Sequence, residues 1–118
     1  MEKSEYSTRF KKIIAIIEQN RETGIEKLRE MAVEGFSEAE DELGFFLSED
    51  DKNDDEAVFW LKKAVGRGNG EAAWNIAMIH RMKRDLVTMR YWIDVSASLG
   101  HADAAYAITQ NYDVSSLL

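Results

Sequence analysis

A repeat with a period of 32–33 residues limits the possible folds of this chain more than any other feature. Three segments align without gaps: GFSEAEDELGFFL from Gly35, GNGEAAWNIAMIH from Gly68 and GHADAAYAITQNY from Gly100. In each, an acid follows the glycine by three positions and an alanine comes next. A large aliphatic residue then follows the alanine by four positions, which gives the pairs Ala39/Leu43, Ala72/Ile76 and Ala104/Ile108. A fixed period of this length predicts stacked units of supersecondary structure.

Each unit has the pattern of two helices joined by tight turns. Ala39, Leu43 and Leu47 fall on one helical face, and Trp60 and Trp92 each precede a glycine of the repeat by eight positions. The chain contains no proline, and Gly35, Gly68 and Gly100 lie just past the ends of expected helices. We therefore predict an all-α fold with seven helices, over 5–19, 22–34, 37–48, 54–66, 70–82, 85–98 and 101–112, in which Trp60 and Trp92 are mostly buried.

The unit from Ala39 to Gly68 resembles the Sel-one-like repeat, a relative of the tetratricopeptide repeat. That family has the pattern Ala-x-x-x-Leu-Gly-x-x-Tyr, an acidic turn, and Ala-x-x-Trp-x-x-Lys-Ala-Ala-x-x-Gly. Its positions are occupied here by Ala39, Leu43, Gly44, Leu47, Asp54 or Asp55, Ala57, Trp60, Lys63, Ala64 and Gly68. The next unit departs from the pattern, with Ile76 at the leucine and His80 at the tyrosine. The resemblance implies a right-handed α-solenoid of helix pairs that serves protein contacts rather than catalysis.

The expected domain organisation is a single domain over 1–118. Residues 1–21 lack the repeat motif and are expected to form an N-terminal capping helix. Helical repeats follow over 22–113, and 114–118 form a C-terminal tail. No arrangement of His, Ser or Lys beside a carboxylate suggests catalysis, so we expect neither an enzyme nor a cofactor.

The negative charge is concentrated in one stretch. The formal net charge is −7, and residues 38–56 hold ten acids against a single base, Lys52. This density disfavours nucleic acid and anionic membranes as partners and favours a basic protein. No apolar run is long enough to span a membrane. Because the chain has no cysteine, we expect it in the cytoplasm.

The densest part of this stretch, Ser48–Ala57, has three interpretations. As a calcium loop it would use Asp51, Asn53 and Asp55, but Glu56 stands where such loops need glycine and Lys62 where they need glutamate. As a helix–helix turn it would place Asp54 or Asp55 at an N-cap, with Glu56 in the first turn. As a binding surface it would attract a basic partner. We reject the calcium loop and leave the other two open.

A row of side chains lies off the expected core face of the first helix in each unit. Asp41, Trp74 and Tyr106 are equivalent positions, and Phe45, Met78 and Gln110 follow one turn later. In stacked helix pairs these positions line the concave side, although some of them can instead pack between units. The predicted partner-binding residues are Asp41, Glu42, Phe45, Glu49, Asp50, Asp51, Trp74, Met78, Arg81, Tyr106 and Gln110.

The expected function is binding of one protein partner. The chain resembles small bacterial immunity proteins, which neutralise a basic toxin stoichiometrically. The alternative is a scaffold or adaptor that joins other proteins without inhibiting them. The sequence leaves the identity of the partner and the oligomeric state open.

Overall fold

The computed structural model describes residues 3–118, which form seven α-helices and two short 3₁₀ helices. The α-helices are α1 (Lys3–Gln19), α2 (Arg21–Val33), α3 (Ser37–Ser48), α4 (Asp54–Gly66), α5 (Gly70–Met82), α6 (Leu86–Ser98) and α7 (Ala102–Thr109), and the 3₁₀ helices are η1 (Asp51–Asn53) and η2 (Ser115–Leu117). The described residues contain no strand, so the all-α prediction is confirmed. Residues 1 and 2, where the predicted capping helix begins, lie outside the described part. Among the described helices, none combines the length and the hydropathy that crossing a membrane requires.

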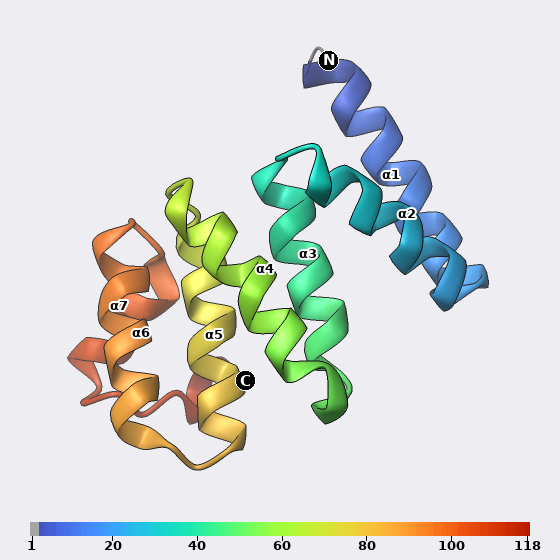
Figure 1. Ribbon diagram of the computed structural model, residues 1–118. Coiled ribbons are helices and arrows are strands. Elements are labelled where there is room, and N and C mark those ends of the chain that lie inside the picture. The colour runs from blue at the N-terminus through green and yellow to red at the C-terminus, as the bar shows by residue number, and fades with distance from the viewer. Residues whose placement is uncertain (1–2) are drawn as a thin grey trace.

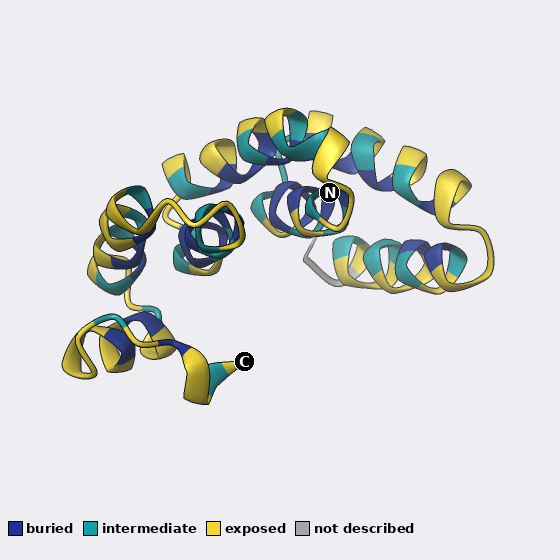
Figure 2. Cartoon of the chain, turned by 90° about the horizontal axis from the view of Figure 1, so that it is seen from below, coloured by how far each residue is buried: buried dark blue, intermediate teal, exposed yellow. Residues whose placement is uncertain are grey.

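The helices form a curved row in which each packs against its neighbours in the chain (Figure 1). Figure 2 shows α1, α3, α5 and α7 on the concave side of the curve and α2, α4 and α6 on the outer side. In addition, α3 contacts α5 directly, so these two inner helices lie side by side. The C-terminal end of the chain also lies on the concave side (Figure 2).

The glycines that define the repeat form equivalent turns. Gly35, Gly68 and Gly100 have φ values of 94°, 89° and 92°, in the left-handed region that favours glycine. Each follows the end of an outer helix and donates its N–H to a carbonyl of that helix's last turn, as Gly68 does to Val65 at 2.8 Å. The sequence period is therefore a period of helix ends.

Two groups of buried side chains form the core. One extends from α1 to α5 and includes Leu43, Leu61 and Ile76, each fully buried, and the other joins α5, α6 and α7. Trp60 is 7% exposed, as predicted, whereas Trp92 is only half-buried. Trp92 packs partly against both groups, since it lies where they meet.

The C-terminal end of the row of helices differs from the prediction. The last helix was expected over 101–112, but α7 ends at Thr109 because Asn111 and Tyr112 both take positive φ values, 56° and 65°. The hydroxyl of Tyr112 donates to Asp94 on α6 at 2.7 Å, which holds this reversal of the chain. The expected tail then packs back, and Val114 is 3% exposed within the second core group.

Candidate functional site

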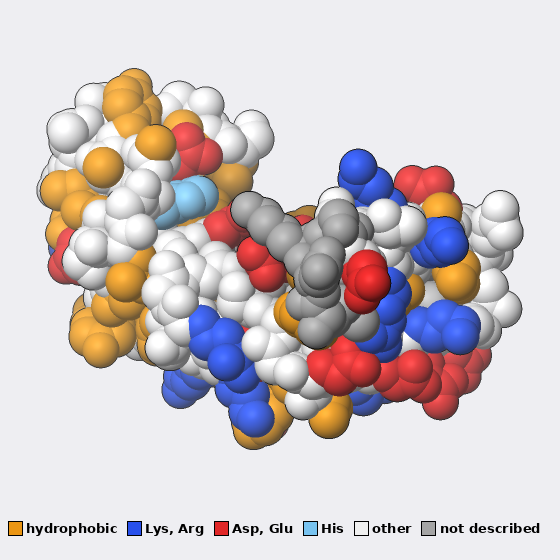
Figure 3. Space-filling model, turned by 90° about the horizontal axis from the view of Figure 1, so that it is seen from above, with side chains coloured by type: hydrophobic (Ala, Val, Ile, Leu, Met, Phe, Trp, Pro, Cys, Tyr) orange, Lys and Arg blue, Asp and Glu red, His pale blue; other side chains and the backbone are white. Residues whose placement is uncertain are grey.

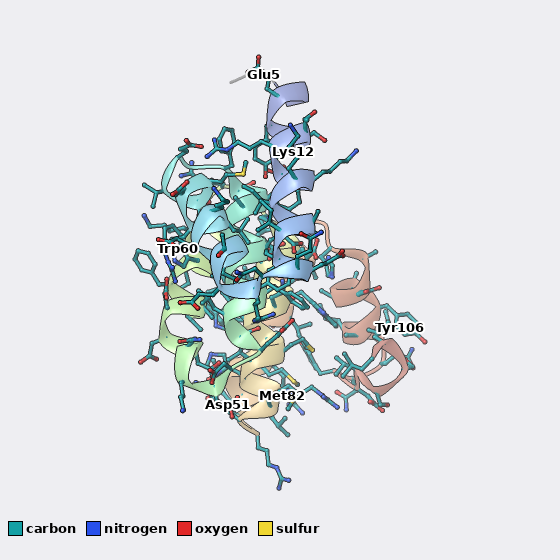
Figure 4. The ribbon with its side chains drawn as sticks, turned by 90° about the vertical axis from the view of Figure 1, so that its right-hand side faces the viewer. Glu5, Lys12, Asp51, Trp60, Met82 and Tyr106 are labelled. Carbon is teal, nitrogen blue, oxygen red and sulfur yellow. The ribbon has the colours of Figure 1, made fainter. Side chains whose placement is uncertain are left out.

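A groove of about 480 Å³ lies on the concave side of the molecule, along α3 and α5. Its far edge is formed by η1 and by the C-terminal residue of the chain. The lining consists of Phe45, Ser48, Glu49, Asp51, Asp54, Trp74, Asn75, Met78, Ile79, Met82 and Leu118. In Figure 4, Asp51 and Met82 lie close together near the lower end of the helices, while Trp60 lies on the opposite, outer side.

The floor of the groove is apolar and partly open to solvent. Phe45 is 43% exposed and Met82 is 77% exposed, and Met78 between them is half-buried. Trp74, Met78 and Met82 follow one another at intervals of four residues on α5, so they form one stripe of that helix. An exposed apolar strip bordered by polar side chains is typical of an interaction surface.

One end of the groove is lined by carboxylates from the end of α3 and the turn after it. Glu49 forms an ion pair with Arg21 at 3.0 Å, and Asp54 one with Lys83 at 3.6 Å. The pair of Arg21 and Glu49 is about half exposed to solvent, so it holds its charges only weakly, whereas the side chain of Asp54 is 13% exposed. No ion pair of Asp51 occurs within the described part of the chain. This end therefore keeps a negative field.

A second group of carboxylates comes from the middle of α3 and the first turn of α5. Oxygen atoms of Asp41, Glu42 and Glu71 lie within 4.8 Å of one another, so these three side chains could together hold a cation. Asp41 is only 4% exposed, and its Oδ1 accepts a hydrogen bond from Nδ2 of Asn75 at 2.8 Å. Figure 3 shows acidic side chains in the hollow on this side of the molecule.

Burial perturbs the acidity of this group. Desolvation raises the pKa of Asp41 to about 7, and the negative charges of Glu71, Glu42 and Glu38 act in the same direction. The hydrogen bond from Asn75 opposes the shift without cancelling it. Burial and the charge of Glu71 also raise the pKa of Glu42. Ionisation of all three carboxylates therefore lowers the stability of the folded protein, and binding of a proton or a cation would offset that loss.

The structure brings together about half of the predicted partner-binding residues. Phe45, Glu49, Asp51, Trp74 and Met78 all line the groove. The sequence left open whether Trp74 is a core residue or a contact residue, and the structure gives it both positions. It is 8% exposed and packs in the second core group, and it also lines the groove. Asp41 and Glu42 lie in the second carboxylate group instead, and Asp41 is buried rather than on the surface.

The other predicted residues lie elsewhere. Asp50 caps η1 by accepting a hydrogen bond from the N–H of Lys52 at 3.0 Å. Arg81 lines a separate hollow that it shares with Asp113. Tyr106 and Gln110 are exposed on α7 but do not line the groove, and Figure 4 shows Tyr106 far from Asp51 and Met82. Tyr106 and Gln110 therefore lie outside this groove, because α7 packs mainly on α6, and their part in partner binding stays a prediction.

The sequence reasoning missed several lining residues. Met82 could have been found, since it continues the stripe of Trp74 and Met78 by one more turn. Asp54 was assigned to helix capping only, although its side chain also lines the groove. Nothing in the pattern signals that Asn75 bonds to a buried carboxylate, or that Leu118 folds back to the groove edge.

The acidic segment 48–57 forms a turn followed by a helix start. Asp51–Asn53 make the 3₁₀ helix η1, and Asn53, not Asp54 or Asp55, is the N-cap of α4. Glu56 in the first turn of α4 accepts two hydrogen bonds of 3.1 Å from Arg29 and one of 3.1 Å from Trp60. Some acids of this segment therefore stabilise the start of a helix, and others line the groove.

No family model, curated protein or solved structure matches the chain. The groove itself offers an apolar floor, one amide, one hydroxyl and carboxylates at one end, and the second group of carboxylates adjoins it through the hydrogen bond between Asp41 and Asn75. This combination suits an apolar group that carries positive charge on both sides.

Proposed function

We propose that this chain is a protein-binding module whose concave groove recognises a basic protein. The observation that carries the proposal is the exposed apolar strip of Phe45, Met78 and Met82, bordered by the carboxylates of Glu49 and Asp51. The apolar side chains would supply most of the affinity, and the acids would steer the encounter and set the association rate.

The form of binding that we favour is stoichiometric neutralisation of the partner, as by an immunity protein that blocks a toxin. A small module with one acidic groove fits a single tight partner, with a dissociation constant in the nanomolar range or below. We further propose a right-handed solenoid of Sel-one-like repeats in the cytoplasm. The equivalent left-handed turns at Gly35, Gly68 and Gly100 support the repeat assignment.

A scaffold or adaptor is the second candidate, and a specific observation favours it. Leu86, Val87 and Tyr91 on the outer helix α6 are 53%, 83% and 61% exposed. None of them lines the groove. An adaptor needs two binding surfaces, and this group would supply the second one.

The test is a comparison of two phenylalanines on opposite sides of the molecule. A partner is recovered from the native host, and its binding kinetics are measured with Phe45→Ala and with Phe59→Ala. Phe59 is 52% exposed on the outer helix α4, so it is a matched control for Phe45. We expect Phe45→Ala to speed dissociation roughly tenfold or more and Phe59→Ala to leave it unchanged. The reverse result would reject the groove as the binding site.

The same partner distinguishes the two candidates. A neutralising protein abolishes the partner's activity at a molar ratio of one to one. An adaptor leaves that activity intact and still binds a second protein, and Val87→Asp on α6 removes the second protein alone.

A further inference from the structure

We infer that the groove binds an amphipathic segment with basic side chains on both sides of an apolar anchor, one side meeting Glu49, Asp51 and Asp54 and the other meeting Glu42 and Glu71 beside the groove. This inference rests on the proposed function and specifies the chemistry of the partner. Three observations carry it: the spacing of the two acidic groups, the apolar strip between them, and the unequal compensation of their charges.

The two acidic groups are separated by about two helical turns along α3. Asp41 and Glu42 precede Glu49 by seven or eight residues on α3, which corresponds to about 11 Å along the helix. On α5, Glu71 lies in the first turn and Met82 is the last residue. The second acidic group does not line the groove, but it adjoins the groove through Asn75, which lines it and donates a hydrogen bond to Asp41.

The side chains between the acidic groups are apolar. Phe45 lies midway between Asp41 and Glu49, and Trp74 and Met78 on α5 line the same groove. An occupant must therefore place an apolar side chain in the middle and charge outside it. A segment whose basic residues all lie at one end would leave one acidic group without a partner, at a cost in affinity.

The charges of the two groups are compensated to different degrees. In the group of Glu49, Asp51 and Asp54, Arg21 pairs with Glu49 and Lys83 pairs with Asp54. Among the described residues, no Lys or Arg lies within 4.0 Å of the carboxylates of Asp41, Glu42 or Glu71. The remaining titratable groups that face this cluster are Glu38 on α3 and Tyr6 on α1, and neither brings positive charge. The carboxylates of Glu42 and Glu71 therefore have no basic side chain among the described residues to compensate them, and an incoming cation could do so.

The test uses two synthetic helical peptides of identical composition as probes. The first carries two lysines at each end of a leucine-rich centre, with the lysine pairs about eight residues apart, and the second carries all four lysines at one end. We expect the first to bind about tenfold more tightly than the second at ~0.15 M salt. Since the first peptide is symmetric in charge, its direction in the groove does not affect the comparison.

Protein variants locate the two contacts. Glu42→Gln combined with Glu71→Gln should remove the preference for the first peptide, whereas Glu26→Gln, an exposed acid on α2, should preserve it. Equal affinity of the two peptides, no binding of either, or a preference that survives the double substitution would overturn the inference. The proposed function has a separate test. It is contradicted if the natural partner binds the Phe45→Ala variant as tightly as the unchanged protein.

Discussion

Asp41→Asn should make the protein more stable at alkaline pH and reduce the dependence of its stability on pH. The native carboxyl is buried and lies among three other acids, which raises its pKa from 3.8 to about 7. An asparagine has nearly the same shape and keeps an oxygen that can accept the hydrogen bond from Asn75. The substitution therefore removes the charge and leaves the packing in place.

The magnitude follows from the shift in pKa. The native state binds the proton of Asp41 more tightly than the unfolded state does, so this residue favours folding at low pH. That contribution is lost as the pH rises from about 4 through about 7, and above pH 7 the ionised carboxylate is buried at full cost. Each pKa unit corresponds to about 1.4 kcal/mol. Between pH 5 and pH 8 the loss amounts to roughly 2–3 kcal/mol.

The assay is urea unfolding of both proteins at these two pH values. We expect the difference in unfolding free energy between Asp41→Asn and the unchanged protein to grow by roughly 2–3 kcal/mol from pH 5 to pH 8. Glu26→Gln, at an exposed position on α2, is the control and should give a nearly constant difference. A constant difference for Asp41→Asn as well would refute the reasoning, because it would mean that Asp41 ionises normally in the native protein.

Three further predictions concern stability. Trp60→Ala should lower the free energy of unfolding by about 3–5 kcal/mol, because the side chain is 7% exposed, and a melting temperature reduced by only a degree or two would contradict its place in the core. Gly44→Ala should destabilise the protein in urea unfolding, because a Cβ there would lie 2.4 Å from Cγ of Leu61. Gly66→Ala is the control and should be neutral or stabilising, because a Cβ at Gly66 would have no atom within 4 Å. Equal effects of the two substitutions would argue against the close contact between α3 and α4. Millimolar calcium should leave the melting temperature unchanged, and a rise that Asp51→Ala abolishes would restore the calcium loop.

The repeat made most of the fold predictable. The positions of Leu43 and Ile76 identified the core face of the inner helices, and the glycines identified where outer helices end, because both depend on local spacing. The third copy was predicted less well. Ile108 is 38% exposed although its equivalents Leu43 and Ile76 are fully buried.

The candidate site was only partly predictable, for two physical reasons. The path of α7 depends on how it packs on α6, which no local pattern encodes, so the sequence could not show that Tyr106 and Gln110 lie outside the groove of α3 and α5. Asp41 was taken for a surface acid because acids usually are. Its burial follows from the contact between α3 and α5 and from the hydrogen bond of Asn75, a residue 34 positions away.

The most direct test of the groove as the binding face is a nuclear magnetic resonance experiment on methyl-labelled methionines. Met78 and Met82 line the groove, while Met31 is fully buried in the first core group and reports on changes in the fold. When the partner recovered from the native host saturates the protein, we predict that the signals of Met78 and Met82 shift or broaden and that of Met31 stays in place. If a saturating partner leaves both Met78 and Met82 unchanged, the groove is not the binding face.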